Sequence, residues 1–190
     1  MDDIVRQAIA KWPNVPDCFG WLGLDARGNW FMRDDSVQAL GAFPTLTEPG
    51  IPGARGSRLQ HEKLIDFIHR NYDVDAGGQW FFQNGPQRVY VELEATPYIW
   101  RLREGGQRGF VITAHTGPTA HLRRCLLDED GRLYLETDLG FGLVHTQDVA
   151  VAADAIEQGL WGPEPVESGT LPALFGYRQS PRTANAGFRP

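Results

Sequence analysis

Three stretches of the chain place their apolar residues at the 3.6-residue spacing of an amphipathic helix. Each stretch is preceded by a polar residue that can cap a helix, and the first and third are followed by a proline or glycine that would end it. The predicted ranges, with their capping residues, are 2–12 (Asp2), 58–72 (Ser57 with Gln60 as a capping box) and 147–158 (Thr146). The pattern therefore predicts three helices, widely separated along the chain.

Between these helices the apolar residues alternate or form short runs, which is typical of β-strands. The segment 88–93 alternates most clearly, with Val89, Val91 and Leu93 on one face. The other predicted strands lie in a hairpin over 19–33, in segments 80–82, 98–102 and 110–112, and in a second hairpin over 125–135. Between the first hairpin and the second helix, residues 34–57 are rich in proline and glycine and predict a long loop, either functional or mobile.

One turn motif occurs three times in the chain. It consists of an apolar residue, Asp, two variable residues, Gly, a polar residue, a bulky apolar residue and an aromatic residue. The copies are Leu24–Phe31, Val74–Phe81 and Leu127–Tyr134. The first and third copies are each followed by a loop and a predicted helix, which favours an internal duplication. The alternative is that D-x-x-G turns recur wherever β-hairpins do.

These patterns predict an α+β fold, made of two similar antiparallel β-sheet-plus-helix lobes in tandem. An N-terminal helix precedes the lobes, and an irregular C-terminal tail follows them. The expected boundaries are 1–94 for the N-terminal lobe, 95–161 for the C-terminal lobe and 162–190 for the Pro/Gly-rich tail, either docked or disordered. A chain of 190 residues is long enough to bury a core without disulfides or metals.

The order of these elements resembles an uncharacterised proteobacterial family of two-lobed α+β proteins of unknown function. The resemblance rests on the Asp/Gly hairpin that leads into Trp30 and Phe31, on the helix and aromatic strands that follow, and on the segment Val89–Tyr98. The chain departs from the family pattern in its long loop and its long tail. The resemblance implies a fold and a sensing or regulatory role, and it implies no catalytic residues.

Charge and composition exclude several classes of protein. The formal net charge is −6, whereas nucleic-acid-binding surfaces begin from a basic excess. No run of about 18 apolar residues occurs, and the N-terminus lacks the basic and apolar blocks of a secretory signal, so we expect no membrane association. The two cysteines, Cys18 and Cys125, form no disulfide framework or four-ligand metal site, which favours a cytoplasmic location.

The best candidate for a ligand site is the Gly-rich segment that leads into the second helix. Free backbone N–H groups and the positive end of a helix attract anions, and nearby arginines would add charge. The candidate anion-binding residues are Arg55, Gly56, Ser57, Arg58 and His61. The segment lacks the lysine of a P-loop and the spacing of a dinucleotide fingerprint. The alternative interpretation is a flexible surface loop beside a self-capped helix.

The aromatic residues divide into expected core anchors and one candidate pocket residue. Trp30 and Trp80 occupy equivalent positions of the hairpin motif, so we expect them in the core, whereas Trp100 is a candidate for an aromatic pocket. No catalytic motif, metal-ligand spacing or cofactor fingerprint occurs, so the catalytic residues are unknown and we expect no metal and no cofactor.

The leading functional hypothesis is a non-enzymatic cytoplasmic module that binds a small anionic ligand or a protein partner, with a role in regulation. The alternative is a small hydrolase in which His61 or His115 works with an acid that folding brings near. In a third hypothesis the tail 162–190 docks onto a second copy of the chain and forms an oligomer.

Overall fold

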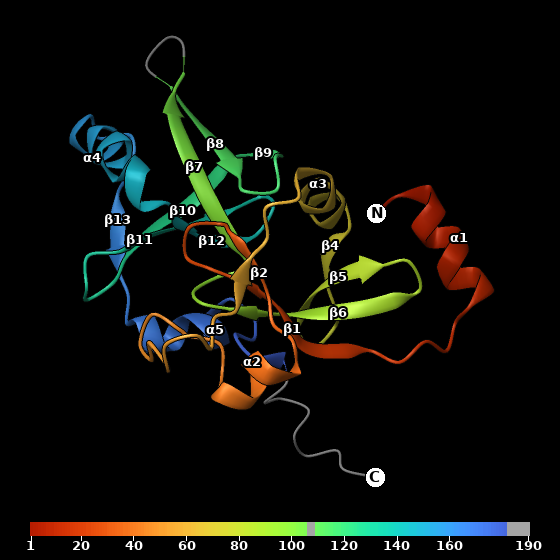
Figure 1. Cartoon of the computed structure of the whole chain (residues 1–190). Helices are drawn as coiled ribbons and strands as arrows, with labels where there is room; N and C mark the ends of the chain where they lie inside the picture. Colours follow the sequence, from red (N-terminus) through yellow and green to blue (C-terminus); the bar gives the residue numbers. More distant parts are fainter. Residues whose placement is uncertain (106–108, 182–190) are drawn as a thin grey trace. The chain divides into compact units, whose positions relative to one another are not determined.

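The computed structural model describes residues 1–105 and 109–181, which divide into two compact units (Figure 1). The first unit comprises Met1–Asp25, Asn29–Ala95 and, of the described C-terminal residues, 176–181. The second unit comprises the short turn Ala26–Gly28 and the long segment Thr96–Phe175. The chain therefore leaves the first unit after Ala95 and returns to it at Gly176.

The first unit is built on a six-stranded sheet with the order β3-β2-β1-β6-β5-β4. Its strands are β1 (Cys18–Leu24), β2 (Trp30–Met32), β3 (Ser57–Arg58), β4 (Tyr72–Val74), β5 (Trp80–Asn84) and β6 (Gln87–Leu93). Strands β1, β2 and β3 form one antiparallel meander and β4, β5 and β6 form another. The two meanders join through the parallel pair β1–β6.

The second unit has a seven-stranded sheet with the order β13-β10-β11-β12-β7-β8-β9. Its strands are β7 (Tyr98–Glu104), β8 (Phe110–Ala114), β9 (Thr119–Ala120), β10 (Leu122–Leu127), β11 (Leu133–Thr137), β12 (Phe141–Val144) and β13 (Pro163–Pro165). Two meanders again join through the parallel pair of their first and last strands, β7 and β12. The α+β prediction is confirmed, with the correction that both sheets are mixed rather than wholly antiparallel.

The helices agree with the three predicted regions but differ in their limits and number. They are α1 (Asp3–Lys11), α2 (Asp35–Leu40), α3 (Glu62–Arg70), α4 (Val149–Glu157) and α5 (Leu171–Leu174), with short 3₁₀ turns at Thr146–Asp148 and Ser168–Thr170. Helix α2 lies inside the predicted loop 34–57 and is capped by the carboxylate of Asp34. The predicted capping box at Ser57 is wrong, because Ser57 belongs to β3 and pairs with Met32.

The three Asp/Gly turns have the same hydrogen bonds. In each, the Asp accepts the backbone N–H of the residue four positions later, and its own N–H donates to the carbonyl of that residue. The glycine in each turn has a φ near +75°, a region that L side chains disfavour. The turns begin at Asp25, Asp75 and Asp128. The hairpins that this motif predicted are thereby confirmed.

Replacing Asp128 by Ala should destabilise the second unit by about 3 kcal/mol, because hydrogen bonds to a buried carboxylate contribute roughly 1.5–3 kcal/mol each. Its Oδ1 accepts the N–H groups of Asp130 and Arg132, and its Oδ2 accepts the Tyr134 hydroxyl at 2.9 Å. The measurement is urea denaturation. The matched control is Asp130→Ala, whose exposed carboxylate binds Arg132 and should change the free energy of unfolding by less than about 1 kcal/mol. Equal effects of both variants would contradict the role of the turn.

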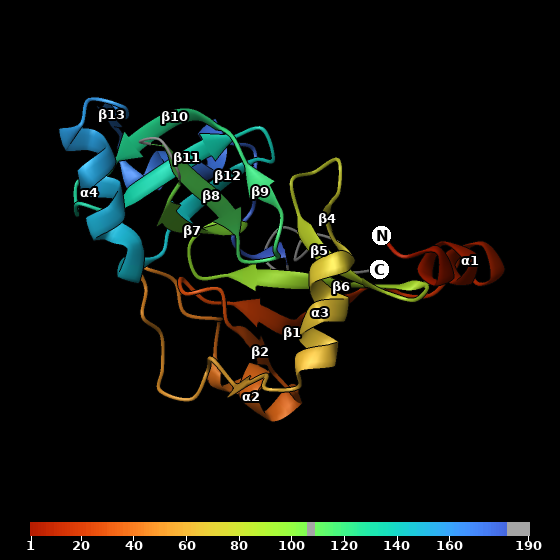
Figure 2. The same ribbon diagram turned by 90° about the horizontal axis from the view of Figure 1, so that it is seen from above.

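The sheet of the first unit carries helix α3 on one face (Figure 2). On this face Trp30 donates its indole N–H to His69 Nε2 of α3 at 3.0 Å, and Trp80 packs against Tyr72. Both tryptophans are buried, as the hairpin motif predicted. The opposite face includes Gly23, over which the ring of Phe43 lies in direct contact.

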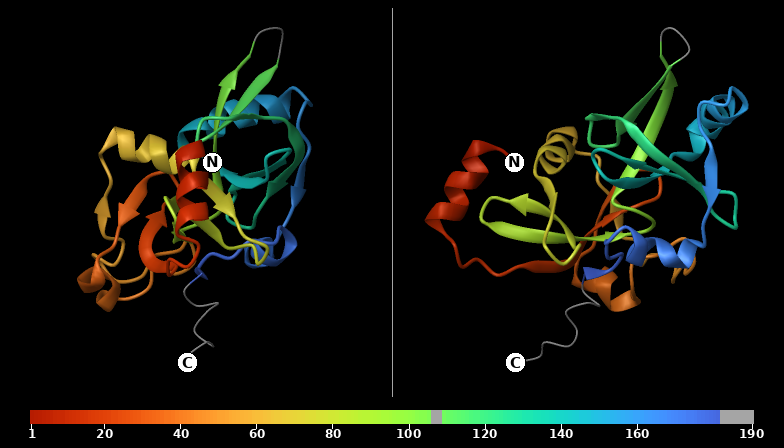
Figure 3. Two further views of the ribbon diagram at one scale, coloured as in Figure 1. Left: turned by 90° about the vertical axis from the view of Figure 1, so that its right-hand side faces the viewer. Right: turned by 180° about the vertical axis from the view of Figure 1, so that it is seen from behind.

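The second unit has its own hydrophobic core, between its sheet and α4. Figure 3 shows the ribbon of this unit from two further sides. Two alanines of α4, Ala152 and Ala155, are fully buried and allow the helix to approach the sheet closely. The tail is partly ordered: β13 pairs with β10, and after Gly176 the N–H of Arg178 donates to the carbonyl of Gly78. In the described ranges, no helix is long and apolar enough to span a bilayer.

Candidate functional site

A buried arginine binds both ends of the long loop between α2 and β3. Arg33 follows β2 directly and is 1% exposed. Its Nε donates to the carbonyl of Ala54 at 2.8 Å, its Nη2 to that of Gly41 at 2.6 Å, and its Nη1 to that of Gly20 at 3.3 Å. The guanidinium thus binds both ends of the loop to the first strand of the sheet.

The predicted anion-binding segment places its first arginine against carboxylates. Arg55 forms a bidentate pair with Glu94, with distances of 2.6 and 2.8 Å, and its Nη1 lies 3.9 Å from a carboxylate oxygen of Asp25. The hydrogen bonds that Arg55 donates to the Glu94 carboxylate raise the pKa of Arg55 despite its partial burial. An anion at Arg55 would therefore have to compete with the carboxylates of Glu94 and Asp25. Anion binding by this segment stays a prediction.

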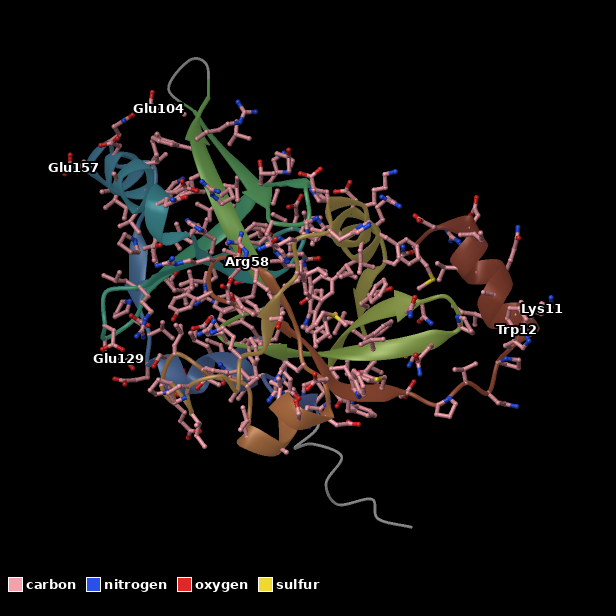
Figure 4. The ribbon with its side chains drawn as sticks, in the orientation of Figure 1. Lys11, Trp12, Arg58, Glu104, Glu129 and Glu157 are labelled. Carbon is pink, nitrogen blue, oxygen red and sulfur yellow. The ribbon has the colours of Figure 1, made fainter. Side chains whose placement is uncertain are left out.

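The other four predicted residues have local structural roles. Gly56 has a φ of +85°, and a Cβ there would collide with the Met32 carbonyl oxygen. Ser57 and Arg58 form β3; Arg58 is labelled in Figure 4. His61 caps α3, because its Nδ1 accepts the N–H of Leu64 at 3.2 Å. The segment reaches α3 only after the strand β3, so His61 alone among the five predicted residues lies at the N-terminus of the helix, and Arg55 binds Glu94.

Trp100 lies in the core of the second unit instead of lining a pocket. Its side chain is 0% exposed, and its indole N–H donates to the carbonyl of Leu135 at 3.0 Å. Trp161 belongs to the same core. Because the Trp100 ring is fully buried, it has no surface that a ligand could contact. This placement does not agree with the prediction that Trp100 lines an aromatic pocket.

The two histidines of the hydrolase hypothesis each accept a backbone N–H. His115 Nδ1 accepts the N–H of Ile99 at 3.2 Å, in the same way as His61 accepts that of Leu64. A neutral imidazole with Nδ1 as acceptor carries its proton on Nε2, so it offers no lone pair for a general base. Within residues 1–105 and 109–181, no three His, Cys, Asp or Glu side chains form a group that could hold a metal ion.

One cavity of about 280 Å³ lies on the loop side of the first unit. Its wall includes two buried side chains of opposite charge, Arg33 and Glu92. The remaining lining residues are Gln38, Gly41, Ala42, Phe43 and Ser180. Arg33 uses its guanidinium to bind three backbone carbonyls of the loop and the first strand. The charged wall of this cavity therefore has a structural role, and the cavity is a less suitable ligand site than the second one, described next.

A second cavity, of about 230 Å³, lies between α3 and the sheet of the first unit. We call it the α3 pocket. Its lining residues are Cys18, Trp21, Leu22, Met32, Leu64, Ile68, Phe82, Asn84, Gln87 and Val89, and none of them carries an ionisable acid or base other than the thiol. Apolar cavities with a few polar groups are the usual form of small-molecule sites. The α3 pocket is therefore the candidate functional site.

The strand register arranges the floor of the α3 pocket in rows. Leu22 pairs with Met32, and together they form an apolar row at one end. Val89 pairs with Cys18 on one side and Phe82 on the other, which makes the middle row. Asn84 and Gln87 pair at the opposite end, next to the β5–β6 turn. The pocket thus changes from apolar to polar along the strands.

A bulge in β1 shapes the edge of the pocket. Cys18 pairs with Val89 and Leu22 with Val91, so four steps along β1 match two along β6. Gly20, inside this irregularity, has a φ of +79°. Bulges re-aim neighbouring side chains, and here Trp21 lines the pocket while remaining partly exposed.

The Cys18 thiol stays protonated in this environment. Partial burial, with a smaller contribution from the negative charge of Asp35, raises the pKa of Cys18 above its ordinary value. A thiol with a raised pKa is a weak nucleophile and behaves as a small apolar group. Cys18 therefore extends the uncharged lining and gives no catalytic nucleophile.

Sequence reasoning did not identify the α3 pocket. The signals were present: Gln87, Val89 and Val91 alternate onto one face, and Leu64 and Ile68 share the inner face of a helix. Such spacing identifies a buried face but does not show where the packing leaves a cavity.

Comparison with known proteins finds relatives of unknown function. A family model described as "Protein of unknown function (DUF2946)" matches residues 1–182. The chain is similar to the crystal structure of a DUF1285 family protein from Silicibacter pomeroyi DSS-3, with 13% identity, 81% of this chain and 84% of that chain covered, and a TM-score of 0.49. For a DUF1285 family protein from Shewanella baltica OS155 the identity is 13%, the coverage 70% and 91%, and the TM-score 0.46. None of the curated proteins matches the chain.

Proposed function

The chain belongs to the family described as protein of unknown function (DUF2946), and on this premise we propose that it is a non-enzymatic module that binds a small molecule in the α3 pocket. The expected membership of an uncharacterised family is confirmed by this match. The observation that carries the proposal is the uncharged cavity of about 230 Å³ under α3. Nothing in the comparisons favours the hydrolase alternative.

The packing of α3 supports a regulatory role for ligand binding. Leu64 and Ile68 of α3 line the pocket, and His69 of the same helix accepts the Trp30 indole hydrogen bond. A ligand under α3 would alter the contacts of the helix with the sheet, and a ligand can shift a protein only through such differential contacts. A cytoplasmic location is part of the proposal and is supported by the two free thiols, Cys18 and Cys125.

We also propose that the two sheets arose by internal duplication. The support is that both sheets contain two three-stranded meanders joined by a parallel pair, in the orders β3-β2-β1-β6-β5-β4 and β9-β8-β7-β12-β11-β10, with β13 as an additional strand at the edge of the second sheet. In this comparison the Asp75 turn corresponds to the Asp128 turn, because each connects the first two strands of the second meander. Only the first unit has a helix between its two meanders, and this helix forms the α3 pocket.

Binding in the α3 pocket should be detectable by saturation-transfer NMR with small fragments. The probes are benzyl and octyl compounds, each tested as the alcohol, the carboxylate and the ammonium ion. We expect at least one head group to bind the wild-type protein, and the variant Leu64→Phe to abolish the signal, because the added ring would fill the cavity.

The matched control places the same side chain one residue away on the exposed side of α3. Lys63 is exposed and does not line the pocket, so Lys63→Phe should leave fragment binding unchanged. Circular dichroism would verify that both variants are folded. Absence of binding by every probe, or equal loss in both variants, would overturn the proposed function.

A further inference from the structure

We propose that the ligand of the α3 pocket is an uncharged amphipathic molecule, whose apolar body lies over Leu22 and Val89 and whose hydrogen-bonding head reaches Asn84 and Gln87. This inference rests on the proposed function and specifies its ligand class. It replaces the anionic ligand that the arginine-containing loop suggested. Three features carry it: the absence of charge in the lining, the direction of the polarity gradient and the orientation of Gln87.

The lining offers no partner for a charged ligand group. All ten lining side chains are uncharged when the Cys18 thiol is protonated. Asn84 at the head end is exposed and Gln87 is half-buried, so a charged head group would lose part of its hydration there, and no opposite charge in the lining would offset that loss. The negative charge of Asp35 acts on Cys18 and contributes to its raised pKa, and the same sign disfavours an anion in the pocket.

The register fixes the direction of the ligand. On β6 the residues Val91, Val89 and Gln87 share one face. Val91 pairs with Leu22 at the apolar end, and Gln87 pairs with Asn84 at the polar end. Four residues of β-strand span about 13 Å. An elongated molecule can therefore cover the apolar rows with its body while its head lies between the two carboxamides.

The head group should be a hydrogen-bond donor. Gln87 donates its Nε2 to the carbonyl of Pro16 at 3.0 Å, which orients the carboxamide. The Oε1 of Gln87 is then the atom that can accept from a ligand, and the Asn84 carboxamide across the strand pair can donate or accept. A hydroxyl or a primary amide satisfies this pair of groups.

The test compares three probes that have the same eight-carbon chain and different head groups: 1-octanol, octanoate and octylammonium. The readout is protection of Cys18 from alkylation by iodoacetamide, measured by mass spectrometry, with the buried Cys125 as an internal control for unfolding. We expect octanol to protect Cys18 at a concentration about tenfold or more below that of either ion, since tenfold corresponds to about 1.4 kcal/mol of unfavourable desolvation. The side-chain amide NMR signals of Asn84 and Gln87 should shift with octanol.

A charge introduced at the head end gives a second, sharper readout. In Gln87→Glu, octylammonium should become at least as protective as octanol, because the new carboxylate would pair with the ammonium group. Gln147→Glu, an exposed substitution in the second unit, should leave the order of the three probes unchanged.

The outcomes separate the two proposals. If none of the three probes protects Cys18 in the wild-type protein and no fragment binds, the proposed function fails. If octanoate or octylammonium protects as well as octanol, or if Gln87→Glu leaves the order of the probes unchanged, this inference is overturned while the α3 pocket remains a binding site.

Discussion

Arg33→Met should destabilise the first unit by about 3–5 kcal/mol, because three backbone carbonyls would lose their guanidinium donor. The variant deprives the carbonyls of Ala54, Gly41 and Gly20 of their donor in a site where Arg33 is 1% exposed. Each buried carbonyl without a partner costs roughly 1–3 kcal/mol. The measurement is guanidinium denaturation combined with limited proteolysis of loop 41–56, which should become susceptible.

Two controls test whether the loss of stability depends on the guanidinium geometry of Arg33 and on its buried position. Arg33→Lys keeps the charge but lacks the planar guanidinium fork, so it should recover only a small part of the lost stability. Arg58→Met removes an exposed arginine on β3 and should change the free energy of unfolding by less than about 0.5 kcal/mol. An effect of Arg33→Met within 1 kcal/mol of zero would show that the loop is held by other contacts.

Trp100→Ala should destabilise the second unit by about 3–5 kcal/mol, because it leaves a cavity in a core where the ring is fully buried. Trp100→Phe retains most of the apolar contacts but removes the donor to the Leu135 carbonyl, and should cost roughly 1–3 kcal/mol. Both values are measured by thermal and urea denaturation.

The matched control for these variants is Trp12→Ala. Trp12 follows α1 and is 51% exposed, and Figure 4 shows it at the outer end of the helix beside Lys11. Its removal should change stability by less than about 0.5 kcal/mol. If Trp100→Ala were as mild as Trp12→Ala, the assignment of Trp100 to the core would be wrong, and the pocket interpretation would return.

Local signals along the chain predicted local structure well. The Asp and Gly of each turn motif lie within four residues of one another, so the hydrogen bonds that define the turn are contained in the motif. The start of α3 was predicted four residues too early because Ser57 satisfies a capping pattern equally well in isolation. Pairing of Ser57 with Met32, 25 positions away, takes precedence over that local preference.

The candidate site could not be predicted in the same way. Arg55 is attractive as an anion-binding residue only while its partner is unknown, and Glu94 lies 39 positions further along the chain. The same reasoning explains Trp100, which an aromatic count cannot assign to a core or a pocket. The α3 pocket draws its lining from β1, β2, α3, β5 and β6, and a cavity exists only where the side chains of such elements fail to fill the space between them.

The amino-acid sequence was enough to predict the α+β class, the three Asp/Gly hairpin turns and the burial of Trp30 and Trp80. Each of these depends on periodicity or on hydrogen bonds between near neighbours. The mixed strand order of the two sheets, the partners of Arg33 and Arg55 and the position of the α3 pocket became visible only in the folded chain. These features depend on which distant segments of the chain come into contact. Such contacts are set by the packing of whole helix and sheet faces, because no single residue's local preference specifies its distant partner.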